Sequence, residues 1–346
     1  MMSGISGEPI HTRCLAVAFT QGQGESVEFR ADILDLRKAG LMSLAGRIAS
    51  AGIIHKMELR GAFSAETGRL ERIEWDQSHV MHEANRSTKG ECCRDPMVRL
   101  KGLVGTRLGE GFAAELKKGF GGPLGCTHIN TLFQELSAFV SRLRAVMIDC
   151  PELPAARATG ERIARRSLYF DAFLPDGGAT TQISVRIADL FFAACDGEGS
   201  ERLLSHDEVR LFAEVDLAGW RLRNVAARER CREGSSCGDM PWQSRSEELS
   251  DFCGQSLGGG MTRFSLQRFS GRDEDARLLS ALLSLAPGMT QVGPALSDAL
   301  LPSSNTRPGG MTSMGPGPCY MLRADGPLIE TLFPVNPRDS ALKPDC

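Results

Sequence analysis

The order of the predicted elements in the first half of this chain recurs in its second half. Arg13-Cys14-Leu15, in the first predicted strand, has a counterpart in Arg166-Ser167-Leu168. A predicted hairpin over residues 54–75 has a counterpart over 211–225, and a glycine-rich turn and a helix follow in each half. We therefore predict an α+β fold of two similar units, each an antiparallel β-meander packed with helices. A degenerate internal duplication would explain the repeated order.

Alternating apolar and polar residues identify the strands. Between Val27 and Leu36, apolar side chains alternate with Glu28, Arg30 and Asp32, which is typical of a half-buried strand. Residues 54–63 alternate in the same way and form a predicted β-hairpin with residues 70–75. Within this hairpin His55 lies on the same side as Met57, so we expect its ring to face the core side. The imidazole is then either a packed core group or part of a pocket wall.

The run from Gly121 to His128 leads directly into the clearest helix pattern of the chain, in which apolar residues recur at helical spacing as far as Met147. Thr127 is the predicted N-cap, which places His128 at the first helical position. Unpaired N–H groups at a helix N-terminus favour thiolate over thiol and neutral imidazole over imidazolium, so we expect a lowered pKa for Cys126 and a neutral His128. The alternative is that both side chains are only packed in the turn.

The length of 346 residues suits two domains. We predict an α+β unit over residues 1–150 that carries the Gly-Cys-Thr-His motif (Gly125-Cys126-Thr127-His128), and a linker over 149–158. A degenerate second α+β unit follows over 159–300, and a Gly/Pro-rich C-terminal arm over 301–346, in which the apolar stretch 319–335 is expected to return to the body.

The second unit lacks the side chains of the motif. The run Gly258–Leu266 aligns with the motif, and it has Met261 and Arg263 where the first unit has Cys126 and His128. We therefore expect the second unit to serve as a scaffold or to contribute pocket walls.

Composition excludes several classes of function. A formal net charge of -3 argues against a nucleic-acid partner. No apolar run approaches the ~18–20 residues needed to span a bilayer, so no membrane partner is expected. The chain has 11 cysteines but no Cys-x-x-Cys pair, and its N-terminal stretch does not read as a signal peptide, so we expect a reduced, cytoplasmic protein.

Phosphate-binding motifs are missing from the sequence. The glycine-rich runs lack the Gly-Lys-Ser/Thr ending of a P-loop, and no Gly-x-Gly-x-x-Gly fingerprint occurs. We therefore predict no cofactor and a small-molecule substrate as the partner. The oligomeric state is left open.

Further candidate ligands surround the hairpin. His79 and His82 would share a face on a helix but lie on opposite faces of a strand. Either Cys92 or Cys93 could join Cys126, His128 and one of His55 and His82 in a mixed Cys/His zinc site, so a bound metal is left open. The sequence does not choose among the nearby carboxylates, which are Asp32, Asp35, Glu58, Glu83, Glu91 and Asp95.

Four segments carry a family resemblance. Ile54-His55-Lys56-Met57, Cys92-Cys93, Leu100–Gly105 and above all Gly125-Cys126-Thr127-His128-Ile129 resemble the bacterial family catalogued as domain of unknown function 2889, over about residues 10–148. Members of that family tend to lie among genes for the catabolism of aromatic or steroid-like compounds. The resemblance implies a small-molecule enzyme and supplies no reaction.

These observations predict a cofactor-independent enzyme of lyase or isomerase type that acts on a hydrophobic or aromatic catabolic substrate. We expect His128 to act as general acid or base with His55 as its partner, and Cys126 to shape the pocket or act as a nucleophile. The helix N-terminus would stabilise developing negative charge. The alternatives are a metal-dependent enzyme and a non-catalytic ligand-binding module.

Overall fold

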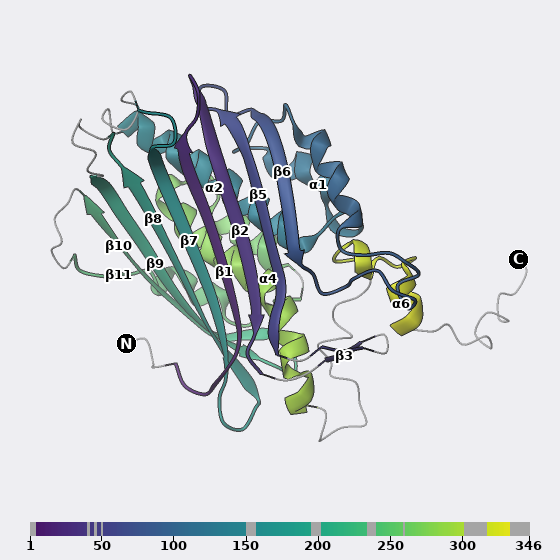
Figure 1. The fold of residues 1–346 in the computed structure, drawn as a ribbon. Coiled ribbons are helices and arrows are strands. Elements are labelled where there is room, and N and C mark those ends of the chain that lie inside the picture. Colours follow the sequence, from purple (N-terminus) through teal and green to yellow (C-terminus); the bar gives the residue numbers. More distant parts are fainter. Residues whose placement is uncertain are drawn as a thin grey trace, which may run out of the picture.

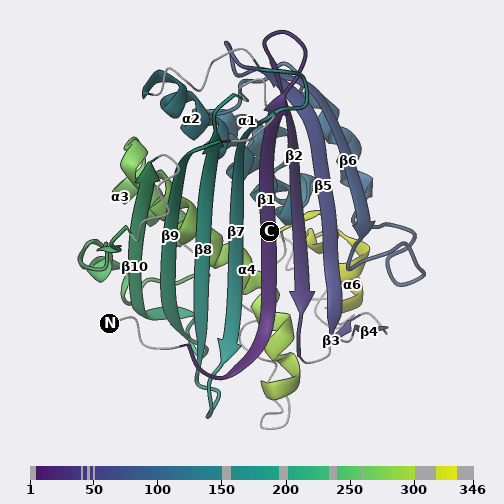
Figure 2. The same cartoon turned by 60° about the vertical axis from the view of Figure 1, so that its left-hand side comes forward.

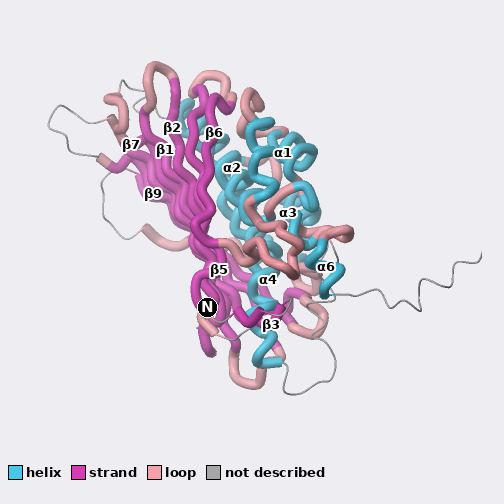
Figure 3. Tube along the Cα trace, turned by 45° about the vertical axis from the view of Figure 1, so that its right-hand side comes forward, coloured by secondary structure: helices cyan, strands magenta, loops and turns pink. Residues whose placement is uncertain are grey.

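The computed structural model describes residues 5–39, 42–44, 47–49, 51–149, 157–194, 202–233, 240–258, 260–300 and 317–332. Within these residues, one nine-stranded antiparallel sheet is covered by helices on a single face (Figures 1 and 3). The predicted mixed α+β class is confirmed. A sheet with one covered face also explains the alternating sequence pattern, because every second side chain is buried under the helices.

The first half of the chain forms one side of this sheet and the second half forms the other, and in each half the strands are added outward from the centre. Their order is β11-β10-β9-β8-β7-β1-β2-β5-β6, so β1 and β7 are neighbours (Figure 2). The hairpins predicted around residues 54–75 and 211–225 are confirmed as β5–β6 and β9–β10. The strands of the sheet are β1 (Glu8–Gln21), β2 (Ser26–Arg37), β5 (Gly52–Ser64), β6 (Leu70–His79), β7 (Arg162–Leu174), β8 (Thr180–Phe192), β9 (Leu203–Asp216), β10 (Arg221–Glu233) and β11 (Gln243–Ser244). A separate short pair is formed by β3 (Met42–Leu44) and β4 (Arg47–Ala49).

Two long helices, α2 (Thr127–Asp149) and α4 (Ala276–Leu300), lie on the covered face of the sheet (Figure 3). The shorter α-helices are α1 (Phe112–Phe120), α3 (Met261–Phe269) and α6 (Pro327–Leu332). Segments of 3-10 helix are η1 (Asp95–Leu103), η2 (Gly122–Leu124), η3 (Glu247–Phe252), η4 (Asp273–Asp275) and η6 (Tyr320–Leu322). None of the helices in the described ranges has the length and apolar character that a membrane crossing needs.

The core lies between the sheet and these two helices. Phe139 of α2 stacks on Phe19 of β1 with ring centroids 4.9 Å apart, and both side chains are fully buried. On α4, a Cβ at Gly288 would come within 2.3 Å of the Phe170 ring of β7, so glycine is needed for this close approach. The packing therefore fixes both helices on the sheet.

Most of the predicted linker and most of the predicted C-terminal arm lie outside the described residues, at 150–156, 301–316 and 333–346. Residues 317–332 pack on the body, as expected for the apolar stretch that begins at Cys319. The N–H of Tyr320 donates to the carbonyl of Gly125 at 2.8 Å, and Thr127 Oγ1 donates to the carbonyl of Pro318 at 2.7 Å. The C-terminal segment therefore meets the Gly-Cys-Thr-His motif directly.

Candidate active site

Five charged or polar side chains share the inner face of three adjacent strands. They are His11 and Arg13 on β1, Asp35 and Arg37 on β2, and His55 on β5, and each is at most 5% exposed. The register places Asp35 opposite both Arg13 and His55, because residues two apart on a strand point to the same face. In an antiparallel sheet β1 and β5 begin where β2 ends, so all five meet at one end of the sheet.

Asp35 is the centre of this cluster. Arg13 donates from Nε to Oδ1 at 2.8 Å and from Nη2 to Oδ2 at 3.0 Å, and His11 Nε2 lies 3.2 Å from Oδ1. Burial alone would raise the pKa of the carboxyl group. The Arg13 guanidinium and the contacts with two histidines outweigh burial and hold the pKa of Asp35 well below its ordinary value. The carboxylate is therefore ionised at neutral pH.

His128 reaches the same carboxylate from the first turn of α2. Its Nε2 lies 2.9 Å from Asp35 Oδ2. The two atoms are within hydrogen-bond distance, but the geometry at Nε2 does not meet the angle of a good hydrogen bond. Burial lowers the pKa of His128 although Asp35 acts in the opposite direction, so the ring is neutral at pH 7. A neutral ring beside a carboxylate carries its proton on the nearer nitrogen, here Nε2, and Nδ1 then holds a lone pair.

His55 stacks on His128 with ring centroids 3.8 Å apart and an interplanar angle of 32°. Its Nδ1 lies 3.9 Å from Asp35 Oδ2. Burial and the neighbouring His128 lower the pKa of His55 well below its ordinary value. Two imidazoles in contact cannot both be charged at low cost, so the pair holds at most one extra proton near neutral pH.

Cys126 stands at the N-cap of α2, one residue earlier than predicted, because the N–H of Asn130 donates to its carbonyl at 2.9 Å. Its Sγ lies 3.8 Å from His128 Nδ1. Burial raises the pKa of the Cys126 thiol to about 12 and outweighs the backbone N–H groups of Ile129 and His128, which lower it. The expected lowering is therefore wrong: the thiol is protonated at neutral pH because burial is stronger than the helix N-terminus.

Gly125 is required for the turn that presents this thiol. A Cβ at position 125 would lie 2.1 Å from the carbonyl oxygen of Phe120 and 2.6 Å from its ring. Any other residue would push the start of α2 away from the end of α1. The Gly-Cys pair thus sets the position of Cys126 and His128 relative to the sheet.

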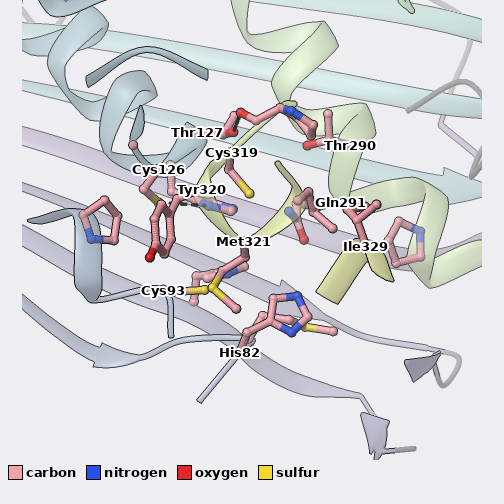
Figure 4. Close-up of a pocket in the computed structure, with 18 of the residues that line it drawn as sticks. His82, Cys93, Cys126, Thr127, Thr290, Gln291, Cys319, Tyr320, Met321 and Ile329 are labelled. Carbon is pink, nitrogen blue, oxygen red and sulfur yellow. Dashed lines mark hydrogen bonds between the residues drawn. The ribbon is translucent and has the colours of Figure 1, made fainter. Parts of the chain in front are cut away.

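The histidine pair and Cys126 open onto a pocket with an empty volume of about 1130 Å³, part of which is open to solvent (Figure 4). Thr290 and Gln291 of α4 line it, and Cys319, Tyr320 and Met321 of the C-terminal segment cover it. Among the lining residues Arg37 alone carries a permanent charge, and most of the others are apolar. The apolar lining residues include Met81, Pro96, Pro294, Met321, Leu322 and Ile329.

The structure brings together most of the residues selected from sequence. His55, His82, Cys93, Cys126 and His128 all line the pocket. His79 is exposed at the end of β6 and does not join them. Cys92 is also outside, since its N–H and thiol both bind the Asp95 carboxylate, at 2.8 and 3.1 Å.

Sequence reasoning missed four members of the cluster. Asp35 was one of six equivalent carboxylates, while His11, Arg13 and Arg37 were not considered. A signal was present, since His11 and Arg13 share their side of β1 with Leu15, Val17 and Phe19. Polar residues that continue the apolar face of a strand point to a buried site.

Three donor atoms of the cluster could also surround a metal ion. Asp35, His55 and His128 each offer one ligand atom, and these three atoms lie within 4.8 Å of one another. Two histidines and a carboxylate are common ligands of zinc and of non-haem iron. Arg13, however, already binds both oxygens of Asp35.

Residues 11–141 match the sequence model of a family described as "Protein of unknown function (DUF2889)". Over these residues the chain resembles DUF2889. Neither a curated protein nor a solved structure matches the chain. The DUF2889 segment contains every residue of the cluster from His11 to His128, whereas α4 and the C-terminal segment complete the pocket from outside it.

Proposed function

We propose that the pocket is the active site of an enzyme that moves a proton on a small hydrophobic or aromatic substrate without a bound cofactor, in a reaction of lyase or isomerase type. The observation that carries the proposal is the contact of 2.9 Å between the ionised Asp35 and a neutral His128 at the pocket wall. A neutral imidazole backed by a carboxylate is a common general base.

In the proposed step His128 Nδ1 takes a proton from a carbon atom beside a carbonyl group. The C–H bond breaks, an N–H bond forms, and the electron pair moves into the carbonyl group as an enolate. Asp35 stabilises the imidazolium, and the N-terminus of α2 stabilises the negative oxygen. The His128 imidazolium then returns its proton to another carbon atom of the substrate or to the leaving group, while His55, stacked on His128, keeps the ring in position. General acid–base catalysis of this kind contributes about 10²–10⁴-fold.

Cys126 shapes the pocket in this proposal. A nucleophilic role requires the thiolate, and a pKa of about 12 leaves almost none of it at neutral pH. Its Sγ also lies 3.9 Å from Met57 Sδ, a packing contact in the wall of the site.

Exchange of substrate protons with solvent tests the proposal. The protein is incubated in D₂O with a panel of aryl and alkyl carbonyl compounds, and deuterium incorporation is followed by mass spectrometry. We expect exchange with at least one compound, its loss in His128→Gln, and its retention in the control His206→Gln on β9. Binding without exchange by any compound would favour a non-catalytic ligand-binding module instead.

A metal-dependent enzyme is the second candidate, because Asp35, His55 and His128 bring three donor atoms within 4.8 Å. The bidentate contact of Arg13 with Asp35 opposes it, since a divalent cation would lie against a carboxylate already neutralised by a guanidinium. Elemental analysis of protein purified without chelators decides between them. A stoichiometric transition metal that His128→Gln removes would favour this candidate.

We also infer that the two halves derive from a duplication. Chain order runs outward from the centre of the sheet in both halves, as β1-β2-β5-β6 and as β7-β8-β9-β10. The buried Arg13–Asp35 pair has a counterpart in Arg166–Asp189, joined from Nε to Oδ1 at 2.7 Å. Arg166 also binds Glu135 and Ser280, and among the described residues no histidine contact of Asp189 corresponds to those that His11 and His128 make with Asp35.

The sequence alignment pairs the glycine-rich run before α3 with the one before α2, whereas the structure supports a different pairing of the helices. Both α1 and α3 have nine residues and begin after a left-handed glycine, Gly111 with φ 82° and Gly260 with φ 85°. On this basis α3 corresponds to α1, and α4 corresponds to α2. The second half then supplies a pocket wall through α4 and no acid–base group.

The proposal places the enzyme in the cytoplasm. Support comes from the cysteines that the structure describes, which are all free thiols.

A further inference from the structure

The charge of Arg37 constrains what the pocket binds, provided that the pocket is the substrate site proposed above. Arg37 ends β2, two residues after Asp35 on the same inner face, and its register partner is His11. The side chain is 1% exposed and lines the pocket together with His55 and His128. A permanent cation therefore lies in the wall of the same pocket as the histidine pair.

The rest of the pocket lining favours an apolar ligand body. Met81, Pro96 and Met321 are among the residues that form this surface. The thiols of Cys93, Cys126 and Cys319 are protonated because burial raises their pKa values. A ligand that fills such a space is apolar over most of its surface and meets a positive charge at one end. The matching ligand is amphipathic and has an anionic end.

A guanidinium group distinguishes among anions. Its planar fork of N–H donors matches the two oxygens of a carboxylate, and it has five N–H groups, so it can bind a ligand while other nitrogens bind the protein. Burial lowers the pKa of Arg37 from its ordinary value, but a guanidinium stays charged throughout the neutral range. A phosphate dianion would call for more donors than this mostly apolar lining offers.

We propose that the pocket takes a small hydrophobic carboxylate, with the carboxylate group at Arg37 and the apolar body against Met81, Pro96 and Met321. Arg37 is then the residue that sets specificity, and the histidine pair faces a carbon atom close to the carboxylate end.

The test is calorimetric titration with three probes, namely 3-phenylpropanoate, its primary amide and phenyl phosphate. We expect the wild type to bind the carboxylate at least tenfold more tightly than the amide or the phosphate. Arg37→Met should abolish this preference and Arg37→Lys should retain part of it. The control Arg186→Met, on the outer face of β8, should keep the preference unchanged.

Three results would overturn the assignment. They are equal affinity for carboxylate and amide, tighter binding of phenyl phosphate, or no carboxylate binding at millimolar concentration. Each uses the wild type alone, so the proposal stays testable if Arg37→Met does not fold. In His128→Gln the carboxylate preference should persist while proton exchange is lost, so failure of the proposed chemistry is distinguishable from failure of this binding assignment.

Discussion

Nε2 of His128 lies 2.9 Å from Oδ2 of Asp35, and this contact joins the first turn of α2 to the end of β2. The carboxylate is completely buried and already receives two hydrogen bonds from Arg13. Its charge is therefore fixed, while the proton on His128 is the part that can move. The proposed chemistry requires both a fixed negative charge on Asp35 and a His128 ring that can gain and lose a proton.

Replacing Asp35 by asparagine removes the charge that stabilises a protonated His128. We expect Asp35→Asn to lower the rate of solvent exchange by about 10³–10⁴-fold, as loss of the carboxylate does in catalytic triads. Asp32→Asn is the matched control, because Asp32 lies on the outer face of the same strand. An Asp35→Asn rate within tenfold of the wild type would contradict the role of this carboxylate.

Cys126 is expected to be dispensable for the chemistry. Because the pKa of its thiol is about 12, Cys126→Ala should keep the exchange rate within about tenfold of the wild type, and so should the matched variant Cys93→Ala in the same pocket. Steady-state exchange assays measure both. A loss of a thousandfold or more in Cys126→Ala alone would instead identify a nucleophile.

Stability should fall as the pH drops from about 7 toward 5. Burial lowers the pKa values of His11, His55 and His128 in the folded state. Below the unfolded value of about 6.5 the unfolded chain binds more protons than the folded one, so the free energy of unfolding decreases by up to about 1.4 kcal/mol per pH unit for each histidine.

Chemical denaturation at several pH values measures this slope. His55→Gln should make it shallower, and His206, whose pKa burial also lowers, adds to what is left. Asp35 contributes in a lower range: its depressed pKa gives stability that is present above about pH 4 and is lost as the pH falls further. A wild-type stability that stays constant between pH 7 and 5 would show that these histidines are not buried and neutral.

The C-terminal segment should be held over the pocket by Arg323. Its guanidinium binds both oxygens of Glu91 at 2.6 and 2.7 Å, on the loop that also contains Cys93. Arg323→Ala should loosen this segment and raise the rate at which a thiol reagent labels Cys319 by about tenfold, since a charged bidentate pair contributes about 1.5–3 kcal/mol and partial exposure reduces this.

The matched control for this labelling experiment is Lys89→Ala. The pair Lys89–Glu330 joins the same two segments, but both side chains are more than half exposed, so its loss should change little. Peptide mass spectrometry resolves Cys319 from the other cysteines. Equal labelling in Arg323→Ala and the wild type would mean that the Glu91 contact does not hold the segment.

Local pattern was sufficient to predict the hairpins, the long helix after Cys126 and the inward direction of His55. It could not select Asp35, because the choice among carboxylates depends on the register of β1, β2 and β5. It also failed for the pKa of Cys126. That value depends on burial by Cys319 and its neighbours, which come from a segment far along the chain.

The histidine ¹⁵N NMR spectrum of the free protein tests the central claim most directly. We predict that His128 at pH 7 is neutral with its proton on Nε2, that Nδ1 is unprotonated, and that Asp35→Asn changes this pattern. A doubly protonated His128 at pH 7, or a neutral ring with its proton on Nδ1, would leave no lone pair facing Cys126 and the pocket, and would contradict the proposed base.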